Sequence, residues 1–208
     1  MADYRVHIDD ADDLARQLLD ALAARGAVEP LGGASGRVLV VGGARSGKSA
    51  WAEAQYANRE CDYVATSATP DDDAEWAERV RIHRERRPST WNTVETLDVA
   101  GVLATPGPPT LVDCLAVWTT RQLDEAGAWE DEPGWREKLA AERSRLIDAV
   151  RATQREVILV SNEVGSGVVP ATFSGRVFRD ELGRVNATVG AVCDQVWLVT
   201  AGIARRLK

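Results

Sequence analysis

Short apolar runs alternate with segments of helical composition from residue 37 to the end of the chain. Runs of four or five apolar residues between polar or turn residues are typical of buried strands. Strands separated by helices build a mainly parallel sheet with helices on both faces. We therefore expect an α/β fold that binds its ligand beyond the carboxyl ends of the strands. The strands that this pattern predicts are Val38–Val41, Tyr63–Thr66, Thr110–Cys114, Val157–Val160 and Val196–Thr200.

The beginning of the chain follows a different pattern. Residues 9–24 place leucines at i, i+4 and i+8, which predicts an amphipathic helix. Residues 31–36 (LGGASG) have the composition of a flexible linker. We predict that residues 1–36 are an N-terminal appendage and that residues 37–208 form the main domain. The pattern leaves open whether the appendage packs on that domain, binds a partner or is only partly ordered.

Residues 42–49 (GGARSGKS) directly follow the first predicted strand and fit the P-loop pattern G-x-x-x-x-G-K-S. In a P-loop the backbone N–H groups surround the phosphates of a nucleotide, and the helix that follows adds the positive end of its dipole. Lys48 would reach the β- and γ-phosphates, and Ser49 would hold Mg²⁺. A glycine-rich turn that only links strand to helix would leave the Lys-Ser ending unexplained. The residues expected to bind a nucleoside triphosphate are Gly42, Gly43, Ala44, Arg45, Ser46, Gly47, Lys48 and Ser49.

Polar residues also follow the other predicted strands. Thr66 and Ser67 follow the second strand, and Asn162 and Glu163 follow the fourth. Asp113 ends the third strand in the manner of a Walker-B acid, which suits coordination of Mg²⁺ together with Ser49 and water. A helix-capping aspartate is the alternative for this residue.

His83 lies in an arginine-rich segment. Residues 69–86 predict a helix that ends before Pro88, and residues 79–87 contain five arginines and one glutamate. Neighbouring cations disfavour the protonated form of a histidine and keep it nucleophilic, while guanidinium groups bind phosphate oxygens. The segment therefore suits attack on phosphorus, although a solvated basic face with an incidental histidine would have the same spacing. His7, the other histidine, has no such surroundings.

Composition limits the class of protein. A chain of 208 residues and 22.5 kDa suffices for one α/β core, and a net charge of −7 argues against a general affinity for nucleic acid. No apolar run approaches the roughly 20 residues of a membrane span, and the N-terminus has no signal-peptide pattern. The three separated cysteines indicate reduced core thiols in a cytoplasmic protein. Packing is the default role for the seven scattered tryptophans.

Several motifs occur together in a fixed order. GGARSGKS is followed by Ala-Thr-Ser at residues 65–67, by H-R-x-x-R-P at 83–88 and by W-x-T-x-E at 91–95. NEVG at 162–165 and the paired FRD and GRVN motifs at 178–180 and 183–186 come later. In this combination, residues 37–204 resemble the bifunctional adenosylcobinamide kinase / adenosylcobinamide-phosphate guanylyltransferase family of cobalamin biosynthesis. The P-loop alone is common to many NTPases, whereas the combination with HRxxRP and NEVG is specific.

The resemblance implies a P-loop NTPase (RecA-like) fold and two reactions at one nucleotide site. In the first, ATP or GTP phosphorylates the aminopropanol hydroxyl of adenosylcobinamide. In the second, GTP transfers GMP to a histidine with loss of pyrophosphate, and adenosylcobinamide phosphate takes the GMP to give adenosylcobinamide-GDP. Covalent catalysis of this kind needs a neutral nucleophile. Mg²⁺ would accompany the nucleotide, and similar enzymes form trimers.

The resemblance also assigns residues. His83 matches the guanylylated histidine, and Lys48 matches the P-loop lysine that acts on the phosphates. Glu95 and Asp113 match positions that contact the guanine nucleotide, and Thr66 and Ser67 match positions near it. The segment that would bring His83 to GTP comprises Arg84, Glu85, Arg86 and Arg87. The appendage and residues 118–143 depart from the family pattern, so corrinoid contacts are not assigned.

Two other functions remain open at this stage. The first is a kinase for a different small molecule, in which His83 only binds phosphate. The second is a nucleotide-gated oligomeric switch or RecA-like assembly without enzymatic activity. The acidic pI and the lack of a basic DNA-binding stripe argue against this second function.

Overall fold

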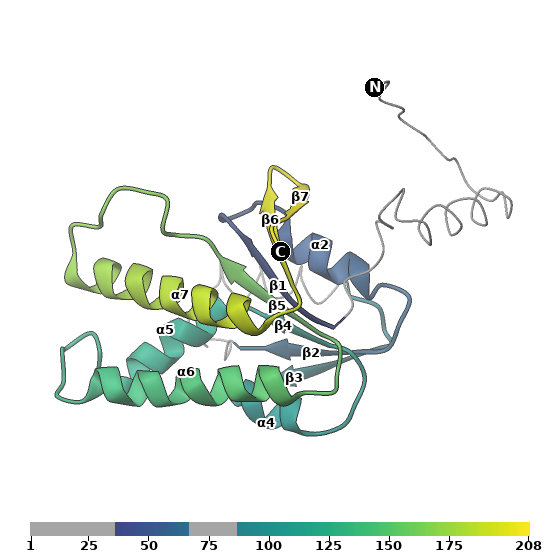
Figure 1. Cartoon of the computed structure of the whole chain (residues 1–208), viewed down its shortest axis with the longest axis horizontal. Helices are drawn as coiled ribbons and strands as arrows, with labels where there is room; N and C mark the ends of the chain where they lie inside the picture. The colour runs from purple at the N-terminus through teal and green to yellow at the C-terminus, as the bar shows by residue number, and fades with distance from the viewer. Residues whose placement is uncertain (1–35, 67–86) are drawn as a thin grey trace, which may run out of the picture. The chain divides into compact units, whose positions relative to one another are not determined.

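A computed structural model describes residues 36–66 and 87–208. Its seven strands form one sheet in the order β3-β2-β4-β5-β1-β6-β7, and every neighbouring pair is parallel except β6 and β7 (Figure 1). The strands are β1 (Arg37–Gly42), β2 (Cys61–Ala65), β3 (Trp91–Glu95), β4 (Thr110–Asp113), β5 (Val157–Asn162), β6 (Gln195–Thr200) and β7 (Ile203–Arg206). The helices are α2 (Lys48–Gln55), α4 (Val99–Ala104), α5 (Leu115–Ala126), α6 (Trp135–Ala152) and α7 (Phe173–Val192).

Strand β1 lies inside the sheet between β5 and β6. Val38 is in register with Ile158 on one side and with Gln195 on the other. Strand β5 separates β1 from β4, so one strand lies between the glycine-rich loop after β1 and Asp113 at the end of β4. Both features therefore lie at the carboxyl edge of the sheet, where neighbouring parallel strands end together.

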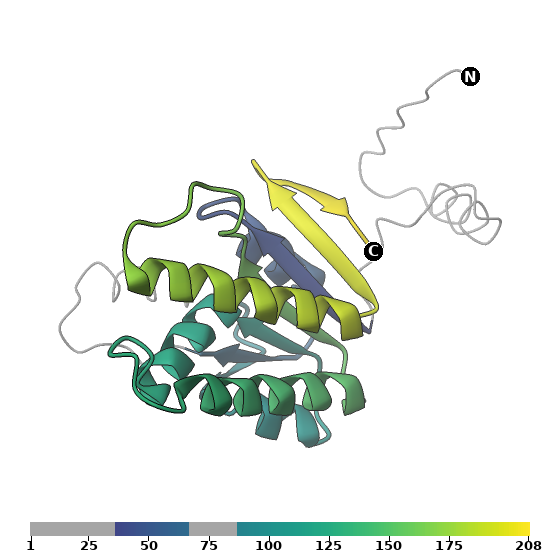
Figure 2. The ribbon, with the colours of Figure 1, turned by 60° about the vertical axis from the view of Figure 1, so that its left-hand side comes forward.

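Alternate residues of β1 pack on opposite faces of the sheet, as the period of two in a strand requires. Leu39 and Val41 belong to an apolar cluster that includes residues of α4, α5, α6 and α7. Val38 and Val40 belong to a second cluster with Ala52 of α2 on the other face. Figure 2 shows α6 and α7 running side by side across the first face. The predicted α/β fold, with helices on both faces of a mainly parallel sheet, is confirmed.

A third apolar cluster joins helix ends rather than strands. Leu123 and Ala126 at the end of α5 pack with Trp135 and Leu139 at the start of α6 and with Val177 of α7. This cluster fixes the end of α5 against two longer helices. Residues 130–134 lie in the connection between α5 and α6.

All five predicted strands are present, with ends that differ by at most two residues. Strands β3 and β7 were not predicted, because both are edge strands of the sheet and neither contains a continuous apolar run. The predicted helices at residues 9–24 and 69–86 lie outside the described residues, and the division at residue 36 stays a prediction. No helix in the described part of the chain is long and apolar enough to cross a membrane.

The cysteines and several tryptophans are packing residues. Cys61 and Cys193 are buried free thiols, and burial raises the pKa of each to about 12. Trp118 is fully buried and donates its indole N–H to the carbonyl of Leu97 at 3.1 Å. The rings of Trp51 and Trp197 pack with their centroids 5.0 Å apart and their planes tilted by 37°. The prediction of core thiols is confirmed for Cys61 and Cys193, whereas Cys114 is only partly buried. The tryptophans named here are packing residues, as predicted.

An ion pair joins the start of β1 to the start of β6. The Arg37 guanidinium donates to both carboxylate oxygens of Asp194, at 3.0 Å from Nε to Oδ2 and 2.6 Å from Nη2 to Oδ1. The backbone N–H of Arg37 donates to the same carboxylate at 2.8 Å. These hydrogen bonds hold the pKa of Asp194 at about 2, below its usual value.

We expect this pair to make stability depend on pH in the acid range. Because the folded pKa of Asp194 is depressed, its contribution is complete above about pH 4 and is lost as the pH falls toward 2. The carboxylate is 44% exposed, so solvent screening limits the contribution to about 1 kcal/mol. Urea unfolding of the wild type and Asp194→Asn should give a difference that shrinks between pH 5 and pH 2.5. Asp148→Asn, on the surface of α6, is the control, and a difference that stays constant with pH would contradict the assignment.

Candidate functional site

The predicted nucleotide-binding residues that the structure describes gather at the carboxyl edge of the sheet. The glycine-rich loop follows β1, Thr66 follows β2, Glu95 ends β3 and Asp113 ends β4. Glu163 follows β5, and its backbone N–H donates to the carbonyl of Gly42 at 3.0 Å. Five segments that are far apart in the sequence therefore border one edge, where α/β proteins bind ligands.

The glycine-rich loop needs glycine at two positions. A Cβ on Gly42 would lie 2.5 Å from both the Ser46 hydroxyl and the carbonyl oxygen of Val199, so any larger residue would push into backbone. Gly47 has φ of 96°, in the left-handed region that favours glycine, and forms the N-cap of α2. The N–H groups of the first turn of α2 have no partner within the helix and are available to a phosphate.

Lys48 extends back across the loop. Its ammonium Nζ lies 3.3 Å from the carbonyl oxygen of Gly43, and the residue is only 9% exposed. The Ser46 hydroxyl is also buried and has no hydrogen-bond partner among the described residues. A buried cation and a buried unpaired hydroxyl at one loop provide the charge and the donor that a phosphate group needs.

A turn near the C-terminus supports the loop from behind. Ala201 and Gly202 form the two-residue connection between β6 and β7, and both have positive φ. The N–H of Gly202 donates to the carbonyl of Ser46 at 2.8 Å. This contact joins residues 156 positions apart, so the final hairpin of the chain holds the phosphate loop in place.

The end of β5 is held by a side chain of α7. Asn186 accepts a hydrogen bond from the Ser161 hydroxyl at 2.5 Å and donates to the carbonyl of Asn162 at 2.9 Å. Glu163 in turn accepts from the N–H of Gly165 at 2.6 Å. The NEVG and GRVN motifs therefore meet in space, and together they fix the segment that borders Gly42.

Asp113 is held by a tyrosine, and that tyrosine contacts an arginine. The Tyr63 hydroxyl donates to Oδ2 of Asp113 at 3.0 Å, while the Arg87 guanidinium lies 3.4 Å from the centre of the Tyr63 ring. Burial and the Asp113 carboxylate raise the pKa of Tyr63 well above its usual value, so it remains a donor. Helix α5 begins at Leu115 without a side-chain cap, so Asp113 does not serve as its cap.

Thr66 links two strands at the carboxyl edge of the sheet. Its hydroxyl donates to the carbonyl of Cys114 at 2.8 Å and accepts from the Cys114 N–H at 3.1 Å, and the residue is 1% exposed. It ties the end of β2 to the end of β4 beneath the site. Burial and then Asp113 raise the pKa of Cys114 to about 11, while Lys48 opposes that rise. Lys48 and Asp113 therefore both lie near Cys114.

The remaining predicted residues are placed as follows. Glu95 is exposed at the end of β3, and Arg87 also donates to the Thr93 hydroxyl at 3.3 Å. Ser49 is half-buried in the first turn of α2. The residues that lie outside the described part of the chain are Ser67, His83, Arg84, Glu85 and Arg86.

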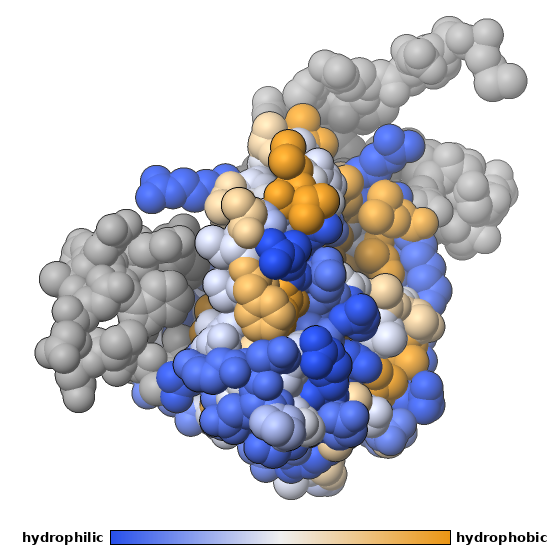
Figure 3. Space-filling model, turned by 90° about the vertical axis from the view of Figure 1, so that its left-hand side faces the viewer, coloured by the Kyte–Doolittle hydropathy of each residue, from blue (hydrophilic) through white to orange (hydrophobic). Residues whose placement is uncertain are grey.

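Apolar side chains are exposed next to this edge. Figure 3 shows the side of the molecule that lies at the left of Figure 1. Hydrophilic residues cover the lower part of this side, and apolar residues lie in its upper part, at the height of the loop between β5 and α7. Val168 and Val169 in this loop are 95% and 60% exposed, and Phe173 is 38% exposed. These apolar side chains belong to the loop that begins at Glu163, whose backbone N–H is bonded to Gly42.

The mainly parallel sheet has helices on both faces, a phosphate loop after the interior strand β1 and an acid at the end of β4. These features define an α/β nucleotide-binding protein of the P-loop class. Comparison with known sequences is more specific. The sequence profile of cobinamide kinase / cobinamide phosphate guanyltransferase (CobU) matches residues 38–207. The chain belongs to this family.

Curated relatives cover nearly the whole domain. The bifunctional adenosylcobalamin biosynthesis protein CobU of Escherichia coli K12 is 39% identical over 181 residues, which cover 82% of this chain and 99% of that protein. The bifunctional adenosylcobalamin biosynthesis protein CobP of Pseudomonas aeruginosa PAO1 is 38% identical over 178 residues, covering 83% of this chain and 97% of that protein. Among solved structures, the P4 protein of bacteriophage phi6 with ADP has a TM-score of 0.43 at 20% identity, covering 82% of this chain and 52% of that one, and we infer nothing from it.

One residue of the site, Tyr63, was missed in the sequence. Tyr63 occupies a position that alternation assigns to the core, so nothing in the pattern distinguishes its hydroxyl. Ala201 and Gly202 follow the last predicted strand and could be singled out, because Ala-Gly between an apolar strand and Ile-Ala-Arg-Arg is a hairpin signal. The contact of Gly202 with the phosphate loop has no signal in the sequence.

Proposed function

We propose that this chain phosphorylates adenosylcobinamide with ATP or GTP and then transfers GMP from GTP to the product, giving adenosylcobinamide-GDP. The chain is a transferase by its family, and the observation that carries the proposal is a complete phosphate loop at the sheet edge of a chain that matches this family over residues 38–207. Both reactions displace a group at phosphorus, so both use the same phosphate-binding loop.

In the kinase step the hydroxyl oxygen of the substrate attacks the γ-phosphorus, and the nucleoside diphosphate leaves. Such a transfer asks the protein mainly to position the phosphates and to offset their charge. Lys48 and the N–H groups at the start of α2 provide both. Since Lys48 is already drawn across the loop toward Gly43, little reorganisation is needed when a nucleotide binds.

In the guanylyl step a His83 ring nitrogen attacks the α-phosphorus of GTP, and pyrophosphate leaves. A phosphate oxygen of adenosylcobinamide phosphate then attacks the same phosphorus and releases His83. The position of Arg87 supports this role, because its guanidinium packs on Tyr63 beside Asp113. Arg87 is four residues after His83, and four extended residues span at most about 14 Å. Chain length therefore allows His83 to reach the nucleotide.

The residues present fit Mg²⁺ as the companion of the nucleotide. Asp113 uses one carboxylate oxygen for Tyr63 and keeps the other, and the Ser49 hydroxyl has no hydrogen bond to another described residue. No group of three or more acidic, cysteine or histidine side chains that could hold a metal occurs in the described residues. Mg²⁺ commonly has one or two protein ligands with waters and substrate phosphates. When bound, it would offset phosphate charge in the transition state.

Tyr63→Phe is expected to weaken metal-dependent nucleotide binding. Without the hydroxyl, Asp113 loses its donor and its orientation, while the ring that supports Arg87 remains. We expect the Mg²⁺ concentration for half-maximal GTP binding to rise about three- to tenfold, the equivalent of one hydrogen bond to a charged group. Tyr56→Phe is a matched control, because the Tyr56 hydroxyl is buried and has no hydrogen-bond partner in the part of the chain that the structure describes. Equal metal dependence in the two variants would remove the positioning role of Tyr63.

Two further features of the proposal rest on indirect support. The free thiols suit the reducing environment of the cytoplasm, where we place the protein. Assembly into a homotrimer stays a prediction from the family resemblance. The same resemblance predicts ATP, GTP, adenosylcobinamide and its phosphate as ligands, and no nucleic acid.

Product analysis tests the proposal directly. The protein is incubated with adenosylcobinamide, Mg²⁺ and either ATP alone or ATP with GTP, and the corrinoids are separated and weighed by mass spectrometry. We expect adenosylcobinamide phosphate in the first mixture and adenosylcobinamide-GDP in the second. Phosphate product alone in both mixtures would indicate a kinase without guanylyl transfer, and unchanged corrinoid in both would overturn the proposal.

A further inference from the structure

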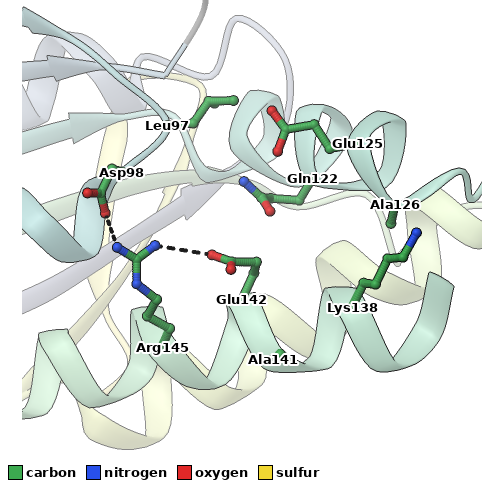
Figure 4. Close-up of a pocket in the computed structure, with 9 residues that line it drawn as sticks. All are labelled: Leu97, Asp98, Gln122, Glu125, Ala126, Lys138, Ala141, Glu142 and Arg145. Atoms are coloured by element: carbon green, nitrogen blue, oxygen red, sulfur yellow. Dashed lines mark hydrogen bonds and ion pairs between the residues drawn. The ribbon is translucent and has the colours of Figure 1, made fainter. Parts of the chain in front are cut away.

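A pocket of about 550 Å³ lies between α5, α6 and the segment that follows β3 (Figure 4). Leu97 and Asp98 form the wall next to β3, and Ala126 and Ala141 are small residues that leave space between the two helices. The nucleotide-binding residues described above do not line it. The polar side chains that line the rest of the pocket are Gln122, Glu125, Lys138, Glu142 and Arg145.

Gln122 is the feature that points to a ligand. It is only 7% exposed, and its amide has no hydrogen-bond partner among the described residues. Figure 4 shows its side chain extending from α5 into the space between α5 and α6. An amide has two donor hydrogens and an acceptor oxygen, and none of these is paired with another described residue, so all are available to a ligand in the pocket.

The charged groups around Gln122 fall into two sets. Arg145 is already engaged, with Nη2 2.6 Å from Oδ1 of Asp98 and Nη1 3.3 Å from Oε2 of Glu142. Glu125 of α5 and Lys138 of α6 form no ion pair within the described residues, and the Lys138 side chain extends toward α5. The pocket therefore offers a carboxylate that accepts hydrogen bonds, an ammonium group that donates them and an amide that can both donate and accept.

This combination matches primary carboxamides. The N–H₂ of a carboxamide can donate to Glu125, its oxygen can accept from Lys138, and Gln122 can pair with either end. A simple anion would be repelled by Glu125, and a simple cation by Lys138. A ligand with several neutral carboxamide arms can pair with all three side chains at once.

The pocket also lies close to the proposed reaction site. Helix α5 begins two residues after Asp113, and at about 1.5 Å per residue Gln122 is roughly 10 Å along it. Leu97 follows Glu95 by two residues, and its carbonyl is bonded to Trp118 of α5. A large substrate whose hydroxyl lies at the phosphate loop can therefore extend into this pocket.

We propose that the pocket between α5 and α6 binds carboxamide side chains of the corrinoid substrate through Gln122, Glu125 and Lys138. The inference rests on the proposed function, since cobinamide carries primary carboxamides around its macrocycle. The pocket holds these arms and not the corrin ring itself.

Binding of adenosylcobinamide and of GTP is measured separately by titration calorimetry on the full chain. We expect Gln122→Leu and Lys138→Met each to weaken adenosylcobinamide binding about three- to tenfold, as the loss of one hydrogen bond predicts, with GTP binding unchanged. Glu137→Gln is the control, because Glu137 is an exposed neighbour on α6 outside the pocket. Lys138 is also exposed, so its variant tests the pocket even if Gln122→Leu fails to fold.

A corrinoid with carboxylic acids in place of its carboxamides provides a second probe. We expect the wild type to bind it more weakly than adenosylcobinamide and Glu125→Gln to recover part of that loss, because the variant removes the repelling charge. Adenosylcobinamide affinities that are equal in the wild type, Gln122→Leu and Lys138→Met would overturn the pocket assignment and leave the proposed function intact. A wild type that binds GTP but no corrinoid would contradict both.

Discussion

Replacing His83 by alanine is expected to abolish guanylyl transfer and to leave the kinase step largely in place. The kinase step needs no covalent intermediate, whereas the guanylyl step needs a nucleophile for which alanine has no substitute. We expect the rate of adenosylcobinamide-GDP formation to fall by about 1,000-fold or more. The first measurement is the intact mass of the protein after incubation with GTP and Mg²⁺. The wild type should gain one GMP, through an adduct that is labile to acid and stable to base, and His83→Ala should gain none.

His7→Ala provides the matched control, because it removes the other histidine of the chain and should leave both activities unchanged. Equal loss of both activities in a folded His83→Ala protein would show that His83 serves the common nucleotide site. A wild type that binds GTP without gaining mass would leave a P-loop kinase in which His83 is a phosphate ligand.

Lys48→Met should damage both reactions. The ammonium is 9% exposed and lies at the phosphate loop, so its removal takes a charge from a position where solvent cannot replace it. Loss of one preorganised donor to a developing phosphate charge typically costs 100- to 1,000-fold in rate. We expect losses of this size in both product assays, together with weaker GTP binding by calorimetry.

Arg151→Met is the control for removal of one cation. Arg151 lies on α6 with 61% of its side chain exposed and pairs only with Asp148 among the described residues. It should keep both activities and its GTP affinity. An unimpaired kinase rate in Lys48→Met would remove the assignment of the phosphate loop.

The sequence predicts the interior of the sheet well, because buried parallel strands need continuous apolar runs. Val38–Val41 and Val157–Val160 are such runs, and they pair in the structure in register. Edge strands are less constrained. In β3 only Trp91 is buried, and Asn92, Thr93 and Glu95 are exposed. One buried apolar residue and three exposed polar residues are as typical of a loop as of a strand.

Some residues of the candidate site could be predicted from the sequence, and others could not. The phosphate loop could be predicted because its residues are contiguous and each has a local geometric task. Asp113 was predicted from its place at a strand end, but its partner Tyr63 was not, since the pairing depends on how β2 and β4 lie side by side. The pocket at Gln122 could not be predicted, because it arises from the distance between two helices and not from any spacing in the chain.

The position of β1 in the sheet has a consequence for synthesis of the protein. Its apolar run pairs only with β5 and β6, and the first residue of β5 emerges 120 residues after the first residue of β1, from position 37 to position 157. At about 5–20 residues per second, the ribosome needs roughly 6–24 s to supply that partner. During this interval the nascent chain presents an unpaired strand of high β-propensity and low charge, the kind of segment that aggregates. Production of the active enzyme in the cell is therefore expected to depend on chaperones that cover the first strand until the last third of the chain has been made.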